Sequence, residues 1–262
     1  KERSINKVFW NNQFGNDEQN RDDDVTRSFK KNDIEFSSYH EKVIFPPGSI
    51  RTAEDKPYSV FTPFKKKWIE NFYLDLLDIE FKYLSKKKTL IESNVSDFKF
   101  KYKRNHSVDM SMWPPGEAHA KDRLELYVSK KILRYSQDRN DPIVDGTSRI
   151  SPYLANGIIS PKRCILEALK MNNFELDTGE KGITKWIDEI IWREFYKNIM
   201  FCFPRVSQNK PFQDYTNNIE WRYEESELDA WKNGNTGFPI IDSAMKQLKS
   251  EGWMHNRLRM VV

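Results

Sequence analysis

One short segment of the sequence, EIIWREFY, carries residue types that could bind a ligand. The residues at the i, i+3, i+4 and i+7 positions of one helix face are Glu189, Trp192, Arg193 and Tyr196. As a ligand wall, this face would stack its rings on a planar molecule, accept hydrogen bonds at the carboxylate and meet negative charge with the guanidinium. The alternative is a packed edge in which the arginine pairs with a carboxylate. The spacing alone leaves both readings open.

The helix that presents this face is predicted over residues 181–202. Its other face repeats apolar residues every four positions, which is typical of a stripe that packs on a core. The stripe consists of Ile187, Ile191, Phe195 and Ile199. Trp186 belongs to the polar and aromatic face, so one side of the helix is expected to be buried and the other to be available for binding.

A second group of candidate residues lies in DGTSRISPYLANG, residues 145–157. Hydroxyl groups of Thr147, Ser148 and Ser151 surround Arg149, just after a glycine. Hydroxyls, one guanidinium and the amides of a helix start would form a suitable phosphate cradle. Thr-Ser pairs after a glycine are often only helix caps, so this motif is not specific when taken alone.

The third group is GWMHNRLRM, residues 252–260, which brings donors and cations together on one helix. It contains Trp253, His255, Asn256, Arg257, Arg259 and Met260. The four histidines of the chain show no metal-ligand spacing, so no metal site is predicted. No nucleophile elbow, P-loop or dinucleotide-binding glycine motif is present.

Composition limits the class of protein. The 262 residues are 38% hydrophobic and 31% charged, which is typical of a soluble globular protein of one large domain or two modest ones. No apolar run approaches the roughly 18–20 residues that span a bilayer. Cys164 and Cys202 are too few for a disulfide framework and fit a reducing compartment. The net charge of +4 permits an anionic partner, and eight tryptophans suit a protein that stacks planar rings.

Both ends of the sequence look cut. The chain begins with KERSINKVFW, without an initiator methionine or a signal-peptide layout, and stops at RLRMVV without a helix stop signal. We therefore expect a fragment of a longer polypeptide.

The first part of the chain reads as mixed α/β. The pattern predicts a helix over 22–31 and short extended segments over 7–11, 34–39 and 42–45. A further helix is expected to begin at Thr62, as its N-cap, with Pro63 in the first position.

The remaining chain reads as a connector and a helical region. Residues 82–116 are charged and weakly periodic, which indicates a linker between domains. Helices are predicted over 117–135, from Ser160-Pro161 onward, over 181–202, and over 238–250, where Gly252 ends the last of them.

Taken together, the motifs resemble the DNA photolyase/cryptochrome family. The resemblance rests on RYSQDRNDPIVDGTSR, TSRISPYLANGIISP, WIDEIIWREFY and WKNGNTGFPIIDSAMKQLKSEGWMHNRLRM, with weaker matches in FWNNQFGNDEQNRDDDV and PPGSIRTAEDKPYSVFTPFKKKW. It implies the later part of an α/β antenna domain (1–81), an interdomain connector (82–116) and the first part of a predominantly α-helical FAD-binding domain (117–262).

Within that family, WREFY and HNRLRM resemble the photolyases that repair cyclobutane pyrimidine dimers. The repair enzymes for (6-4) lesions carry a second histidine where this chain has Asn256. The resemblance implies a carbon–carbon lyase that acts on UV-damaged DNA, in which photoexcited, reduced FAD donates an electron to a flipped-out dimer. The alternative is a cryptochrome-type blue-light photoreceptor that signals through protein partners. A helical interaction module without a cofactor is the third class considered.

The resemblance also implies roles for individual residues. The positions that match FAD contacts are Tyr135, Thr147, Ser148, Arg149, Ile150, Ser151, Trp186 and Arg259. The positions that match contacts with DNA or the lesion are Arg139, Glu189, Ile190, Ile191, Trp192, Arg193, Glu194, Phe195, Tyr196, Asn256, Arg257 and Met260. Asp17 and Glu18 match the place of a folate (methenyltetrahydrofolate) antenna, although Asp17 replaces the asparagine expected there.

The family further implies a monomer without metal or membrane attachment, in the nucleus of a eukaryote or in the cytoplasm otherwise. No segment here matches the last helices of the family's catalytic domain, which supply further flavin contacts. We therefore expect repair activity from the complete protein and not from this fragment.

Overall fold

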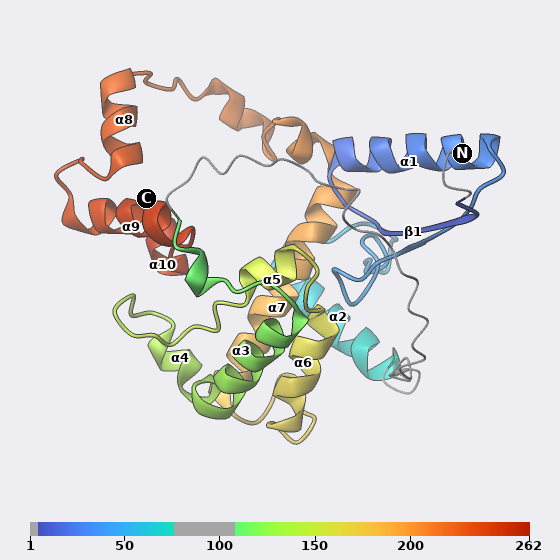
Figure 1. Ribbon diagram of the computed structural model, residues 1–262, viewed down its shortest axis with the longest axis horizontal. Coiled ribbons are helices and arrows are strands. Elements are labelled where there is room, and N and C mark those ends of the chain that lie inside the picture. Colours follow the sequence, from blue (N-terminus) through green and yellow to red (C-terminus); the bar gives the residue numbers. More distant parts are fainter. Residues whose placement is uncertain (1–4, 76–107) are drawn as a thin grey trace.

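The computed structural model describes residues 5–75 and 108–262. Its N-terminal part is a β1–α1–β2 unit made of strand β1 (Lys7–Asn11), helix α1 (Asn16–Lys31) and strand β2 (Glu35–Tyr39). The two strands are parallel, with Lys7 opposite Glu35, and α1 is the crossover that a parallel pair requires. This unit lies on one side of the molecule (Figure 1).

Helices make up most of the remaining described chain. They are α2 (Phe61–Asp75), α3 (Glu117–Lys130), α4 (Tyr135–Asp138), α5 (Ser151–Ala155), α6 (Pro161–Lys170), α7 (Lys181–Cys202), α8 (Glu225–Asn233), α9 (Pro239–Glu251) and α10 (Asn256–Arg259). Short 3-10 turns join them at η3 (Met110–Met112), η4 (Ile132–Arg134), η5 (Pro204–Gln208) and η6 (Asp214–Asn218). A small α/β unit followed by a helical region confirms the fold class expected from the sequence.

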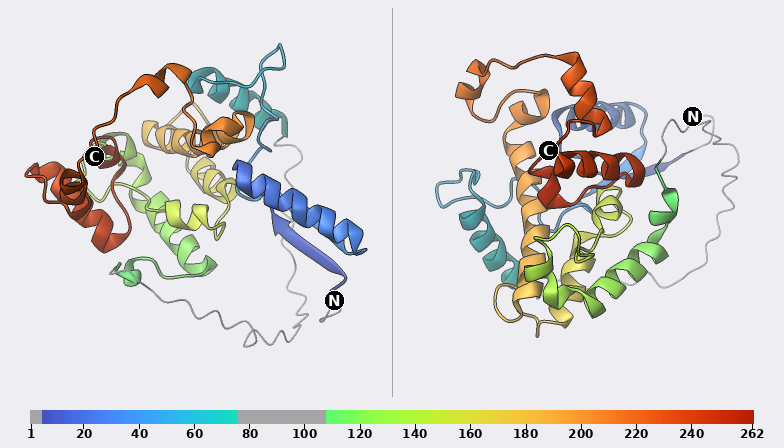
Figure 2. Two further views of the ribbon diagram at one scale, coloured as in Figure 1. Left: turned by 90° about the horizontal axis from the view of Figure 1, so that it is seen from above. Right: turned by 90° about the vertical axis from the view of Figure 1, so that its left-hand side faces the viewer.

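Helix α7 is the central element of the fold. It contacts α2, α4 and α6. Of the predicted stripe, Ile187, Ile191 and Phe195 are buried, and Ile199 is partly buried against the same core. Both predicted limits of this helix are confirmed. Figure 2 shows α7 as the long helix around which the other elements are arranged.

A second, smaller hydrophobic cluster lies at the C-terminal end of the chain. It joins α9 to α10 through Ala244, Met245, Met254 and Leu258, and is separate from the main core around α7. The predicted end of α9 is confirmed, because Gly252 adopts the left-handed conformation, with φ 65°, just after it.

One predicted strand is absent. Residues 42–45 form bends, because the backbone N–H groups of Ile44 and Phe45 donate to the carboxylate of Glu194 on α7 and not to a neighbouring strand. Helix α1 begins before the predicted residue 22, and α2 begins at Phe61, one residue before its expected cap.

The expected division into domains stays a prediction. Most of the proposed connector, from residue 82 to residue 107, lies outside the described residues. Within the described part of the chain, no helix is long and apolar enough to cross a membrane.

Candidate functional site

A cavity of about 370 Å³ lies between α7, the loop that leads into α5, and the segment around α10. All eight residues expected from the sequence to contact a flavin line it: Tyr135, Thr147, Ser148, Arg149, Ile150, Ser151, Trp186 and Arg259. Glu189, Ile190, Arg193 and Asn256, which were expected near DNA, line it too. The structure therefore brings together residues that are far apart in the sequence.

Three residues of the cavity were not assigned a ligand contact from the sequence: Leu154, Trp253 and Met254. Leu154 lies within DGTSRISPYLANG, and the other two lie within GWMHNRLRM. Their position within these motifs was the only signal that the sequence offered, because an apolar or aromatic residue of a motif is as often part of the core.

The walls of the cavity carry aromatic, apolar and hydroxyl side chains. Trp186 is buried, and its indole N–H donates to the Ser148 hydroxyl at 3.3 Å. Burial, and then the nearby carboxylate of Glu189, raise the pKa of Tyr135 to about 12. Its hydroxyl therefore stays protonated at neutral pH and can donate a hydrogen bond.

Arg149 occupies a strained position in this cavity. Its backbone has φ 48°, in the left-handed region that non-glycine residues rarely adopt, and such strain is concentrated at functional sites. The guanidinium lies 4.6 Å from the ring of Trp253. Its Nε is buried, makes no hydrogen bond with a described residue, and lies 3.6 Å from the carboxylate of Asp145.

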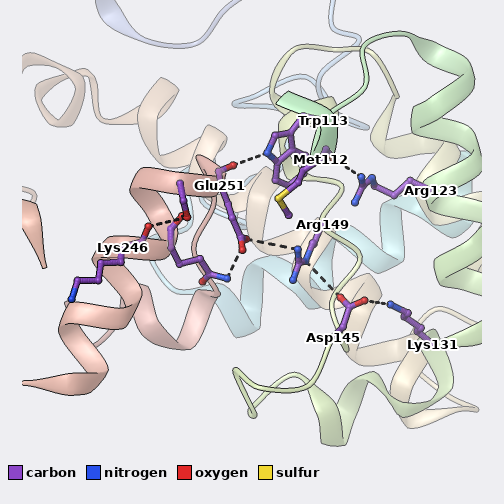
Figure 3. A network of polar contacts seen from close by, with 10 residues as sticks. Met112, Trp113, Arg123, Lys131, Asp145, Arg149, Lys246 and Glu251 are labelled. Atoms are coloured by element: carbon purple, nitrogen blue, oxygen red, sulfur yellow. Dashed lines mark hydrogen bonds and ion pairs between the residues drawn. The ribbon is translucent and has the colours of Figure 1, made fainter. Parts of the chain in front are cut away.

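A network of polar contacts holds Arg149 from two sides (Figure 3). Its guanidinium is 3.6 Å from Asp145, which also pairs with Lys131 of the segment after α3, and 3.8 Å from Glu251 at the end of α9. The backbone carbonyl of Glu251 accepts a hydrogen bond from Trp113 at 2.6 Å. The network therefore connects both sides of the cavity through one charged side chain.

The predicted phosphate cradle differs in one respect from its expected form. Helix α5 has only five residues, and the Ser160 cap belongs to the next helix, α6. The helix start that the motif was expected to provide therefore belongs to a helix of little more than one turn.

Glu189 is half-buried and forms an ion pair with Arg139, with the oxygen 2.6 Å from the guanidinium nitrogen. Arg139 also lies over the ring of Tyr135 at 5.2 Å. Arg257 donates two hydrogen bonds to the side-chain oxygen of Asn140, at 2.7 and 2.9 Å. The cations expected to meet DNA therefore gather beside the cavity.

Trp192 does not line the cavity. It is half-buried, and its indole stacks with the rings of Phe61 and Tyr196. Tyr196 and Met260 are exposed, at 59% and 72%. The lesion contacts expected of these three residues stay predictions.

Several residues expected to contact DNA are placed elsewhere by the structure. Ile191, Glu194 and Phe195 are at most 5% exposed, so their contact with DNA stays a prediction that their burial does not support. Ile190 is equally buried, although it borders the cavity.

Glu194 is instead a structural carboxylate. It accepts hydrogen bonds from the backbone N–H of Ile44 at 2.6 Å, the backbone N–H of Phe45 at 2.9 Å and the Trp68 indole at 2.8 Å. Burial raises the pKa of Glu194, and these hydrogen bonds oppose that shift. The residue attaches α7 to the N-terminal part of the chain.

Arg193 has a similar role in attachment. Its guanidinium donates to the backbone carbonyls of Lys42 at 2.5 Å and Leu154 at 3.0 Å. Burial lowers the pKa of Arg193. The guanidinium was expected to meet a negatively charged ligand, but in the structure it donates to two backbone carbonyls. The side chain lies where α7 meets α5 and the N-terminal segment.

The two residues expected to hold a folate lie at the start of α1. Asp17 and Glu18 are exposed in its first turn, and the backbone N–H of the preceding Asn16 donates to Ser207 at 2.9 Å. Folate binding stays a prediction. Among the described residues, no cluster of histidine, cysteine or carboxylate side chains could hold a metal ion.

An α/β unit followed by helices, with one cavity lined by hydroxyl and aromatic side chains, is the arrangement that the resemblance implied for a flavin-binding protein. Comparison with known proteins agrees with this class. The family described as DNA photolyase matches residues 1–82, and the FAD binding domain of DNA photolyase matches residues 186–262. The chain belongs to the DNA photolyase/cryptochrome family, and FAD is the cofactor for which the matched domain is described.

Individual relatives support the same family. The chain is 35% identical to the deoxyribodipyrimidine photo-lyase of Escherichia coli over 99% of its own length and 54% of that protein. It is 36% identical to the deoxyribodipyrimidine photo-lyase of Neurospora crassa over 85% of its length and 38% of that protein. The chain spans about half the length of the E. coli relative and a smaller share of the N. crassa relative.

Solved structures show the same fold. A class III photolyase from Agrobacterium tumefaciens is 26% identical and superposes with a TM-score of 0.76, covering 98% of this chain and 53% of that chain. A cryptochrome from Synechocystis superposes with a TM-score of 0.73 at 19% identity, over 97% of this chain and 53% of that chain. The second likeness concerns the fold alone.

Proposed function

We propose that this chain is part of a light-dependent lyase that splits cyclobutane pyrimidine dimers in DNA with FAD as its cofactor. The observation that carries the proposal is the single cavity lined by all eight residues expected to contact the flavin. The relatives named deoxyribodipyrimidine photo-lyase support the same activity. Because the chain spans only about half of the first of these relatives, the activity is proposed for the complete protein.

The side chains of the cavity fit a flavin dinucleotide. The rings of Trp186 and Trp253 offer flat apolar surfaces, and the hydroxyls of Thr147, Ser148 and Ser151 can donate to phosphate oxygens. The guanidinium of Arg149 lines the same cavity and is a cationic donor that can meet a phosphate. Bound FAD, once reduced and illuminated, supplies the electron that opens the cyclobutane ring.

The chain's own residues would bind and orient the flipped-out pyrimidine dimer. Glu189 borders the cavity, where its carboxylate can accept hydrogen bonds from a base edge. Trp192 offers an aromatic surface for stacking, and Arg139 and Arg257 offer positive charge for the backbone. A dimer is less costly to flip out than a normal base pair, because it stacks and pairs badly.

Three further properties are inferred from this function: the oligomeric state, the cellular compartment and the place of an antenna chromophore. We infer that the complete protein works as a monomer, in the nucleus if its source is a eukaryote and in the cytoplasm otherwise. We also infer that a folate antenna, if the protein has one, lies beside Asp17 and Glu18. Light scattering of the complete protein tests the first inference, and the folate content of the purified protein tests the last.

The repair function is tested with the complete protein, reduced FAD and an oligonucleotide that contains a thymine dimer. Blue light should restore the ultraviolet absorbance of separate thymines, whereas samples kept in the dark should not change. Bound and reduced flavin without recovery would contradict the proposal and favour the photoreceptor alternative. If the protein retains its flavin but does not bind the dimer-containing oligonucleotide, the proposed DNA contacts are wrong and the cofactor assignment is unaffected.

A further inference from the structure

His255 is a buried histidine that directly precedes helix α10. Its side chain is 2% exposed, and its Nδ1 accepts a hydrogen bond from the backbone N–H of Arg257 at 3.2 Å. This contact makes His255 the N-cap of α10. Because Nδ1 can accept a hydrogen bond only as an unprotonated nitrogen, the ring is neutral and carries its hydrogen on Nε2.

Helix α10 is too short to be stable by its own propensity. It has four residues, and the first N–H groups of any helix have no acceptor within the helix. A single turn does not recover the cost of helix nucleation. Two contacts besides the cap hold α10 in place: Leu258 is buried in a cluster with Met254, and Arg257 donates to Asn140.

The orientation of α10 decides where its polar side chains lie. Asn256 and Arg259 line the flavin cavity, and Arg257 meets Asn140 beside it. Successive side chains of a helix point about 100° apart, so a small rotation of α10 would carry a side chain out of the cavity wall. The cap at His255 therefore affects the shape of the flavin cavity as well as the helix.

The surroundings of His255 oppose a positive charge on its ring. Burial lowers the pKa of His255, and the positive charges of Arg257 and Arg149 lower it further. The carboxylate of Asp141 acts in the opposite direction, with a smaller effect. The ring lies 6.2 Å from that of Trp253 and nearly perpendicular to it, and Nε2 is buried without a hydrogen-bond partner among the described residues. The site therefore stabilises the neutral ring.

We propose that neutral His255 is a positioning residue for flavin binding, because its Nδ1 holds α10 in the orientation that places Asn256 and Arg259 in the wall of the flavin cavity. The inference rests on the FAD-dependent function proposed above. A protonated ring has no lone pair at Nδ1 and cannot accept the N–H of Arg257, so the cap is lost when His255 gains a proton. Flavin binding is therefore coupled to a proton on a residue that does not itself line the cavity.

The test compares His255→Asn with His255→Ala in the complete protein. Asparagine is a strong N-cap that does not titrate, whereas alanine offers no acceptor. The dissociation constant of oxidised FAD is measured from about pH 5 to 8 through the fluorescence of free flavin. Near neutral pH, wild type and His255→Asn should bind FAD with similar affinity. His255→Ala should bind about fivefold more weakly, which corresponds to the loss of one helix cap.

Measurements at lower pH separate a capping role from a packing role. The affinity of wild type should fall toward that of His255→Ala below about pH 6.5, because the ring gains a proton there. The affinity of His255→Asn should stay constant. The control His119→Asn, at an exposed position of α3, should keep the pH dependence of wild type. The inference would be overturned by a wild-type pH dependence in His255→Asn, or by equal affinities of wild type and His255→Ala at neutral pH.

A second measurement does not depend on whether the alanine variant folds. NMR of the ring nitrogens distinguishes the two neutral forms of a histidine, and the signal that is missing from His255→Asn identifies this ring. Wild type at neutral pH should carry hydrogen on Nε2 and none on Nδ1. Hydrogen on Nδ1 would overturn the inference even where flavin binds normally. Wild type that binds no FAD at any pH would instead contradict the proposed function, on which the inference rests.

Discussion

The ring of Phe61 lies flat against the indole of Trp192, with ring centroids 3.6 Å apart and planes inclined by 7°. Tyr196 stacks near the same indole, at 5.6 Å and 24°. Phe61 belongs to α2, so an element of the N-terminal half fixes the orientation of a side chain on α7. An indole held in this way loses little further freedom when a base stacks on it, which favours binding.

Trp192→Ala should weaken binding to dimer-containing DNA by roughly 1–3 kcal/mol, the magnitude of one lost base stack. Flavin content should not change, because Trp192 does not line the cavity. Titration of labelled duplexes with and without a dimer measures the effect. Tyr215→Ala removes an exposed aromatic ring elsewhere and should have no effect on dimer affinity. Equal losses on damaged and undamaged duplexes would argue against a lesion contact.

Arg149→Ala combined with Ser151→Ala should lower flavin occupancy, because it removes a guanidinium and a hydroxyl from the same wall of the cavity. The ratio of flavin absorbance to protein absorbance after purification measures occupancy. The control Arg163→Ala with Ser129→Ala makes the same chemical changes outside the cavity and should purify with normal colour. Full occupancy in the first variant would contradict the phosphate-cradle assignment.

Glu194→Ala should lower the free energy of unfolding by about 3 kcal/mol or more. The variant leaves three donors in or near the core without their acceptor, and each costs roughly 1–3 kcal/mol. Urea unfolding of the protein measures the change. Glu125→Ala, at an exposed position of α3, should change stability by less than about 0.5 kcal/mol. A loss equal to that of the control would show that the carboxylate does not attach the two parts.

Lys197 should make stability depend on pH in the alkaline range. Burial lowers the pKa of Lys197 to about 8, with help from the nearby positive charges of Arg193 and Lys42. Because its pKa in the unfolded chain is about 10.4, the unfolded state binds more protons between these values. The contribution of Lys197 to the free energy of unfolding therefore rises with pH through that window.

Lys197→Met removes this titration and keeps an apolar contact with Phe14, whose ring lies 5.0 Å from the ammonium group. The variant should be more stable than wild type at neutral pH by about 1 kcal/mol, a value discounted for partial exposure to solvent. Its advantage should shrink as the pH rises from about 8 toward 10. Unfolding curves of both proteins at several pH values test the sign. An advantage that does not change with pH would contradict the assignment.

The local sequence predicted the long elements well. Helix α7 begins and ends at the expected residues, α6 begins at the expected serine and proline, and α9 ends at the expected glycine. In α6 and α9 these signals agree with the apolar period. The segment 42–45 was wrongly expected to be extended, since its apolar residues are buried by contact with α7 and not within a sheet. A partner carboxylate about 150 positions away leaves no trace in the local pattern.

The candidate site was also only partly predictable from the sequence. The residue types and the order of the motifs identified the set of residues expected to contact a flavin, and all eight of them line one cavity. The set of residues expected to contact DNA includes buried side chains, because a continuous motif includes every face of its helix. The side chain of Glu194 points to the N-terminal segment, and that of Glu189 points to the cavity.

The amino-acid sequence by itself determined the long helix α7, the starts or ends of α6 and α9, the family, and the chemical types of the residues expected to contact a flavin, because these follow from short-range spacing and motif order. Tertiary structure alone decided that Glu194 and Arg193 attach the N-terminal segment, that Glu251 shares Arg149 with Asp145, and that Arg257 bonds to Asn140. Such pairings depend on which distant elements pack together, and packing is set by the sum of many long-range contacts that no single segment encodes.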